Sequence, residues 1–97
     1  MNIEEIKELL SKYKAEIVQK FGVEKIGVFG SYVRDEQSVE SDIDIIVQFK
    51  RVYKTFDNYM DLKFYLENLF SEKVDLIIES AIKDNLKPYI LKEVQYA

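Results

Sequence analysis

The stretch that decides the fold is Val28-Phe-Gly-Ser-Tyr-Val-Arg-Asp-Glu-Gln-Ser-Val-Glu-Ser-Asp-Ile-Asp-Ile-Ile-Val47. One apolar run stops at Gly30-Ser31, and a second, Ile45-Ile46-Val47, is opened by Asp42-Ile43-Asp44. Short apolar runs bounded by glycine and polar residues are typical of buried strands. The stretch therefore predicts two strands with a polar connection between them.

Acidic residues mark the start of the second strand. Residues i and i+2 of a strand point to the same face, roughly 6–7 Å apart, so Asp42 and Asp44 are expected to project together. Neighbouring carboxylates repel each other, and at least one of Asp42, Asp44 and the later Asp75 should have a raised pKa. A bound cation removes this repulsion, and paired carboxylate oxygens with room for water and phosphate suit Mg²⁺.

A third acidic residue interrupts the later apolar run Val74-Asp75-Leu76-Ile77-Ile78. A carboxylate within an apolar strand is costly unless it is ionised and has a partner. Asp75 is either a strand-end residue that faces water or a third metal ligand from an adjacent strand. The presence of Asp42 and Asp44 favours the third ligand.

The Gly30-Ser31 pair suggests the other half of a site. A strand that ends in Gly-Ser before a short polar helix or turn leaves backbone N–H groups free to bind an anion such as phosphate. A phosphate site beside metal-binding carboxylates indicates phosphoryl or nucleotidyl transfer. The chain has neither Gly-Lys-Ser/Thr nor Gly-x-Gly-x-x-Gly, so P-loop and dinucleotide-binding folds are not supported.

Composition narrows the chemistry further. The 97 residues include no cysteine and no histidine, which excludes disulfides, zinc–thiolate sites and serine–histidine catalysis. The net charge of −4 argues against strong nucleic-acid binding. There is no 18-residue apolar run for a membrane span, and the acidic N-terminus is unlike a signal peptide. We expect one cytoplasmic domain spanning residues 1–97.

The remaining elements follow from periodicity. A helical stripe runs from Ile3 to Phe21, with Asn2 as N-cap and Gly22 as the stop. Further predicted elements are a strand at 23–29, a helix at 56–70, a strand at 74–78 and a final helix with Pro88 in its first turn and an apolar face of Ile90, Leu91 and Val94. This order predicts an α/β (α+β) fold, with helices packed on a mixed, mostly antiparallel sheet.

Several residues keep two interpretations. Gly27 either allows close backbone packing or is a simple strand irregularity. Arg34 either contacts a phosphate or holds the loop by pairing with Glu36 or Glu40. The basic segment with Lys50, Arg51 and Lys54 is either a solvated loop or a contact for an acidic partner or a nucleotide phosphate.

The spacing of these motifs resembles a known family. Gly30-Ser31, then ten residues, then Asp42-x-Asp44 is similar to the signature of the polymerase-β-like nucleotidyltransferase superfamily. With Arg34, Glu36, Ser41 and Val74-Asp75-Leu76, almost the whole chain resembles the MNT-type minimal nucleotidyltransferases. One departure is Asp35, because the family often has glycine after the arginine; aspartate tolerates positive φ better than most residues.

The resemblance implies a function. Asp42 and Asp44 would bind two Mg²⁺ ions, and Asp75 would complete the metal site and assist the attacking hydroxyl. Gly30 and Ser31 would hold the triphosphate of ATP, with Arg34 as a further phosphate contact. The partner would be a helical HEPN-type ribonuclease toxin, neutralised when the antitoxin transfers AMP to one of its tyrosines.

Two other functions remain open. The chain could be a non-catalytic nucleotide-binding antitoxin that neutralises its partner by binding alone. It could also be a metal-dependent nuclease, which would use clustered carboxylates but would not explain Gly30-Ser31.

Overall fold

The first helix and strand show how closely local sequence signals set the fold. In the computed structural model, which describes all 97 residues, α1 spans Ile3–Phe21. Asn2 caps its N-terminus in a capping box with Glu5, and Gly22 ends it with φ of 64°. Strand β1 follows at once, at Val23–Phe29. The predicted caps and bounds are confirmed.

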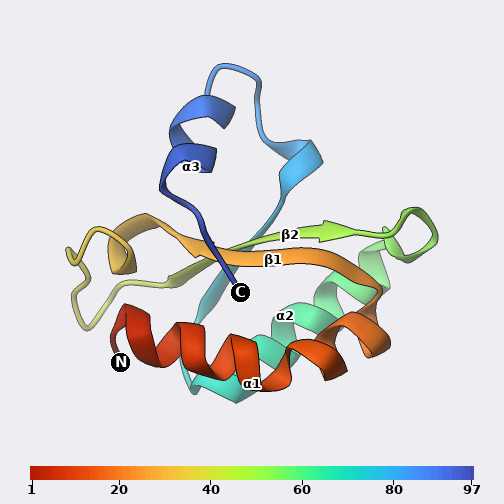
Figure 1. Cartoon of the computed structure of the whole chain (residues 1–97), viewed down its shortest axis with the longest axis horizontal. Helices are drawn as coiled ribbons and strands as arrows, with labels where there is room; N and C mark the ends of the chain where they lie inside the picture. The colour runs from red at the N-terminus through yellow and green to blue at the C-terminus, as the bar shows by residue number, and fades with distance from the viewer.

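The rest of the chain alternates between strands, short turns and helices (Figure 1). After the 3-10 turn η1 come, in order, β2, the turn η2, α2, β3, the turn η3, α3 and β4. Their bounds are Gly30–Tyr32 (η1), Ile43–Phe49 (β2), Arg51–Tyr53 (η2), Phe56–Phe70 (α2), Val74–Ile78 (β3), Glu79–Ala81 (η3), Lys87–Glu93 (α3) and Gln95–Tyr96 (β4). No helix combines the length and apolar character needed to cross a bilayer.

The four strands form one sheet in the order β3-β2-β1-β4. Strand β1 runs antiparallel to both β2 and β4, whereas β2 and β3 are parallel. The connection through α2 supplies the long crossover that parallel neighbours require. The expected α+β fold with a mixed, mostly antiparallel sheet is confirmed.

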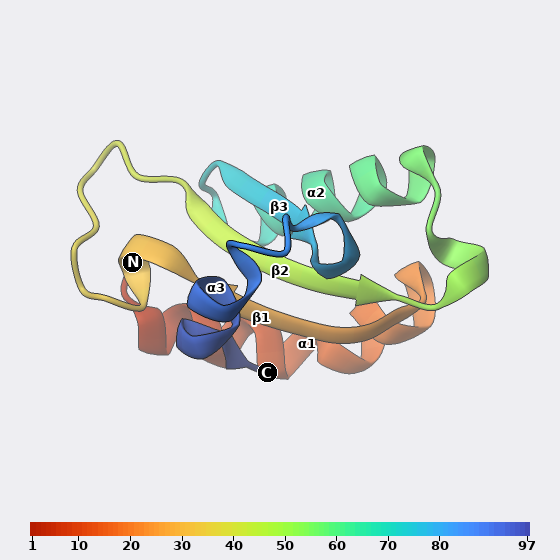
Figure 2. The ribbon, with the colours of Figure 1, turned by 90° about the horizontal axis from the view of Figure 1, so that it is seen from above.

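The two faces of the sheet are covered differently (Figures 1 and 2). Helices α1 and α2 cover one face and enclose the main core, to which β2 contributes Ile43, Ile45, Val47 and Phe49. Helix α3 lies over the other face, where a smaller apolar cluster contains Phe29, Ile46 and Ile82. Because side chains alternate along a strand, the residues of β2 between its core positions point towards α3.

The C-terminal segment differs in part from the sequence prediction. Ile90 and Val94 pack against the smaller cluster as expected, but Leu91 is exposed. Adjacent helical residues point about 100° apart, so Ile90 and Leu91 cannot both face the sheet. The pairing of Gln95–Tyr96 with β1 was not predicted.

This segment explains Gly27. A Cβ at this position would lie 2.8 Å from Cγ1 of Val94 and 2.9 Å from the carbonyl oxygen of Gln95. The backbone of the C-terminal segment therefore lies closely against β1 at the glycine. Close packing, the first of the two interpretations of Gly27, is the one that the structure supports.

Replacing Gly27 with valine is expected to lower the free energy of unfolding. Overpacking of this kind costs about 1–3 kcal/mol, which chemical denaturation measures directly. Glu24→Val is a matched control, because Glu24 lies on the same strand but is exposed, and it should change stability much less. Equal unfolding free energies for the two variants would contradict the close approach.

Candidate active site

The predicted site residues gather at one edge of the sheet. Antiparallel pairing places Phe29, the last residue of β1, opposite Asp44, so the Gly30 turn begins beside the start of β2. Parallel pairing places Asp75 of β3 directly opposite Asp44 on the other side. Asp42 lies one residue before β2. The topology thus brings the glycine turn and the aspartates to the same end of three adjacent strands.

Asp44 and Asp75 also share a face of the sheet. Ile43 and Ile45, which flank Asp44, are fully buried in the main core, so the carboxylate points to the α3 side. Val74 and Leu76 enclose Asp75 in the same way. Adjacent strands lie about 4.8 Å apart, so these two carboxylates are close neighbours. Asp44 is half-buried, whereas Asp75 is exposed.

The electrostatics of Asp44 reflect this environment. Burial, followed by the charges of Asp75 and Asp42, raises the pKa of Asp44 from 3.8 to about 6. The guanidinium of Arg34 acts in the opposite direction. The expectation that at least one of the three carboxyl groups has a raised pKa is confirmed.

Gly30 packs directly against this carboxylate. Its φ is 80°, and a Cβ at this position would lie 2.1 Å from Oδ2 of Asp44. Any side chain at position 30 would therefore displace the carboxylate or the turn. The next residue, Ser31, is half-buried, and its carbonyl oxygen accepts a 2.9 Å hydrogen bond from the backbone N–H of Glu36. That bond helps to close the loop after the turn.

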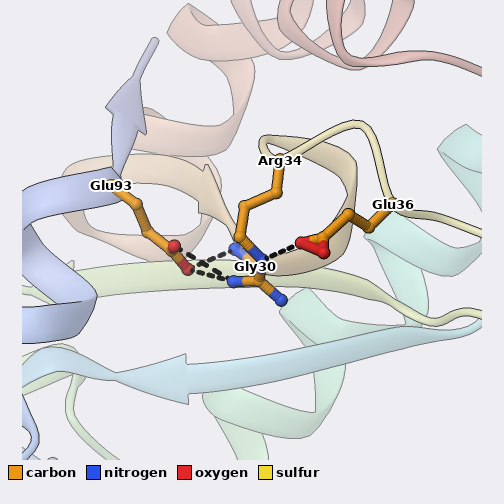
Figure 3. Close-up of polar contacts among 4 residues, drawn as sticks. All are labelled: Gly30, Arg34, Glu36 and Glu93. Carbon is orange, nitrogen blue, oxygen red and sulfur yellow. Dashed lines mark hydrogen bonds and ion pairs between the residues drawn. The ribbon is translucent and has the colours of Figure 1, made fainter.

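Arg34 takes part in a network of ion pairs (Figure 3). Its Nε donates to Oε1 of Glu36 at 2.6 Å, one of the two pairings that the sequence suggested. Its Nη1 donates to both carboxylate oxygens of Glu93, at 3.0 Å each. The backbone N–H of Gly30 donates to Oε1 of Glu93 at 2.9 Å. The second carboxylate partner of Arg34 is thus Glu93, whereas no pairing with Glu40 is found.

Glu93 is the residue of this site that sequence reasoning missed. It lies at the end of α3, where only an apolar face was predicted. Its contact with Gly30 joins residues 63 positions apart, and nothing in the local sequence signals such a contact. Asp35, by contrast, has φ of 57°, the positive value that its position after the arginine suggested.

Some of the candidate residues do not converge on a closed site. No three acidic side chains approach one another closely enough to form a preformed metal site. Lys50, Arg51 and Lys54 follow the C-terminal end of β2, opposite to the end that carries Asp44 (Figure 2). A seven-residue strand is about 23 Å long, so these basic residues lie outside the acidic site.

Comparison with known proteins agrees with this geometry. Residues 10–97 match the family described as "Nucleotidyltransferase domain". The chain is 41% identical over 96 residues to the protein adenylyltransferase MntA of Thermococcus cleftensis, covering 99% of this chain and 96% of the relative.

Two solved structures share the fold. One, provisionally described as a minimal nucleotidyltransferase, superposes with a TM-score of 0.78 at 28% identity, over 98% of this chain and 95% of the other. The second is the complex of tri-AMPylated Shewanella oneidensis HEPN toxin with MNT antitoxin, with a TM-score of 0.65 at 18% identity over 94% of this chain and 70% of the other. At that identity the second likeness concerns the fold alone.

The Gly30 turn, the aspartates on β2 and β3 and the family match over most of the chain lead to one conclusion. This protein belongs to the nucleotidyltransferase domain family, and within it to the minimal nucleotidyltransferases.

Proposed function

We propose that this chain is a Mg²⁺-dependent protein adenylyltransferase that transfers AMP from ATP to a tyrosine of a HEPN-type toxin and thereby acts as an antitoxin. The observation that carries the proposal is the pairing of Asp44 with Asp75 on adjacent strands, immediately beside the Gly30 turn. The adenylyltransferase name of the Thermococcus relative and the AMPylated toxin in the structural neighbour support the choice of AMP and of partner.

The residues fit Mg²⁺. Magnesium usually takes one or two carboxylates and completes its shell with water and substrate phosphates, so a preformed cage of three carboxylates is not required. Asp44 and Asp75 supply this pair, and Asp42 adds a third carboxylate near enough to raise the pKa of Asp44. The raised pKa shows that an unneutralised charge is costly at this position. Two bound Mg²⁺ ions would neutralise phosphate charge and polarise the entering and leaving oxygens.

The remaining residues would bind and orient the nucleotide. The backbone at Gly30 and Ser31 would hold the triphosphate, because the missing side chain of Gly30 lets an anion approach the main chain closely. Arg34 would contact the same phosphates, because its guanidinium and the Gly30 N–H already share one anionic group, the carboxylate of Glu93. Asp42, Asp44 and Asp75 would be the metal ligands.

The reaction would be an in-line displacement. The tyrosine oxygen forms a bond to the α-phosphorus of ATP, and the bond from that phosphorus to the bridging oxygen breaks, releasing pyrophosphate. Asp75 is more exposed to solvent than Asp44, with which it is paired. It would accept the hydrogen bond of the attacking hydroxyl and take up its proton. The acceptor would come from the partner, and we infer that residues 1–97 act as one catalytic domain in the cytoplasm, where ATP is available.

The raised pKa of Asp44 predicts how stability depends on pH. A carboxyl whose pKa is raised in the folded state binds its proton more tightly there than in the unfolded chain. The free energy of unfolding of the metal-free protein should therefore fall as pH rises from about 4 to 6 and stay reduced above that. Thermal melts of the wild type from pH 4 to 8 measure this fall.

Asp44→Asn should remove this dependence. At pH 7.5 it is expected to be more stable than the metal-free wild type by about 1–2 kcal/mol, a figure reduced for the partial exposure of Asp44. Millimolar Mg²⁺ should raise the melting temperature of the wild type more than that of the variant. Parallel pH profiles for the two proteins, with and without Mg²⁺, would count against the assignment.

Incorporation of label from ATP tests the chemistry. With a HEPN-type partner and Mg²⁺, α-labelled ATP should label the partner and γ-labelled ATP should not. Asp42→Asn, Asp44→Asn and Asp75→Asn should each reduce incorporation by about 100-fold or more, the usual scale for loss of a group that stabilises transition-state charge. Asp61→Asn, in α2 on the other side of the sheet, is the matched control and should retain activity. Label from the γ position would indicate phosphorylation, and cleavage of RNA would indicate a nuclease.

Co-expression with the partner separates an enzyme from a binding module. The mass of the HEPN-type protein should increase by one or more AMP units, and this gain should disappear with Asp42→Asn. A partner tyrosine replaced by phenylalanine should lose the corresponding AMP unit. Full neutralisation of the toxin by the Asp42→Asn chain, without any change in mass, would favour an antitoxin that acts by binding alone.

A further inference from the structure

The backbone N–H of Gly30 already has an anionic partner (Figure 3). Oε1 of Glu93 accepts from this N–H at 2.9 Å and from Nη1 of Arg34 at 3.0 Å, and Oε2 accepts from the same Nη1 at 3.0 Å. The side chain of Glu93 is 25% exposed and that of Arg34 is 50% exposed, and the bond from Glu93 to the Gly30 N–H is partly buried. It bridges the end of α3 and the turn that follows β1.

These donors are the ones expected to hold a nucleotide phosphate. A carboxylate and a phosphate make the same demands on a guanidinium and a backbone N–H: negative charge and oxygen acceptors about 2.9 Å away. The Gly30 N–H is a single donor, so one anion at a time can take its full hydrogen bond. A nucleotide phosphate that binds the Gly30 N–H must therefore displace Glu93.

The element that carries Glu93 is suited to such movement. Helix α3 has only seven residues, and none of them is fully buried. It is held on the sheet by Ile90, with Val94 just beyond its end, rather than within the main core between the sheet and α1 and α2. Elements with few buried contacts open at lower free-energy cost than the core. Withdrawal of Glu93 does not require the site-bearing strands to separate.

We infer that the carboxylate of Glu93 is an internal competitor for the phosphate-binding turn and sets the affinity of the chain for nucleotide. This rests on the proposed function, since it assigns the Gly30 turn to ATP phosphate. The free chain would hold its own anion on Gly30 and Arg34, and ATP would bind after exchanging with it. Glu93 is thus an affinity-determining residue and takes no part in bond formation.

Glu93→Gln tests this inference, with Glu36→Gln as a matched control. Both substitutions remove one negative charge and one ion-pair partner of Arg34, but only Glu93 bonds to the Gly30 N–H. Calorimetry with ATP and Mg²⁺ should give a dissociation constant about tenfold lower for Glu93→Gln than for the wild type, the scale of one charge-assisted hydrogen bond. For Glu36→Gln the change should stay within about twofold. Adenosine, which has no phosphate, should bind all three proteins alike.

Each contrary result has a distinct meaning. Equal tightening by both substitutions would show that net charge, not occupation of the turn, sets affinity. Weaker ATP binding by Glu93→Gln would show that Glu93 braces the turn or takes part in metal binding. Both results overturn the inference and leave the proposed function standing. If none of the three proteins bound ATP, the proposed function would fail and the inference with it.

Amide hydrogen exchange of the wild-type protein tests the displacement of Glu93 without any substitution. Saturating ATP with Mg²⁺ should increase amide hydrogen exchange in residues 87–96, because release of Glu93 loosens α3 and β4. Exchange in α1, on the opposite face of the sheet, should stay unchanged. Slower or unaltered exchange in 87–96 would contradict displacement of Glu93.

Discussion

The packing of the Asp44 carboxylate against the bare Cα of Gly30 is the constraint on which the site depends. A Cβ at position 30 would overlap Oδ2 of Asp44, and the φ of 80° at Gly30 disfavours any other residue as well. The β1–β2 register, which sets Phe29 opposite Asp44, brings the two residues together. The turn and the acidic pair are therefore packed together, and a side chain at position 30 would displace one or the other.

Packing elsewhere in the sheet has to offset the unfavourable charge of Asp44. Asp44 is half-buried beside Asp75, and the rise in its pKa shows that the folded state holds its charge unfavourably. On the opposite side of β2, Ile43 and Ile45 are fully buried in the apolar core. Burial of each such side chain contributes about 1.5–3 kcal/mol, enough to offset one strained carboxylate. Because side chains alternate along β2, the residues that stabilise the fold lie on one face of the strand and the candidate catalytic carboxylate lies on the other.

Local signals explain why so much of the fold could be predicted from the sequence. Asn2 caps the N-terminus of α1 and Gly22 ends the helix, each through its own local chemistry. The apolar runs of β1 and β3 are long enough to be recognised as strands from the sequence. Asp44 and Asp75 could be brought together as a hypothesis because Asp44 opens one apolar run and Asp75 interrupts another. Their direct opposition depends on the parallel register of β2 and β3, which no local pattern determines.

What could not be predicted lies in the C-terminal segment. Strand β4 has only two residues, too few to show alternation, and it pairs with Gly27 and Val28 in the first third of the sequence. In the sequence, Glu93 is indistinguishable from other surface charges, and only the tertiary fold places it beside Gly30. Both contacts join residues more than 60 positions apart, and such pairings follow from the tertiary fold alone.

These two unpredicted contacts have a common consequence. Gln95 and Tyr96 fasten the segment to β1, Val94 packs over Gly27, and Glu93 reaches the turn two residues beyond Val28. The anchor and the carboxylate are therefore consecutive in the chain, so the position of Glu93 depends on how firmly β4 is paired. The backbone of this segment contacts the site but contributes little to the main core. Substitutions within 87–96 can alter the electrostatics around Asp44 while leaving the core and the three aspartates unchanged.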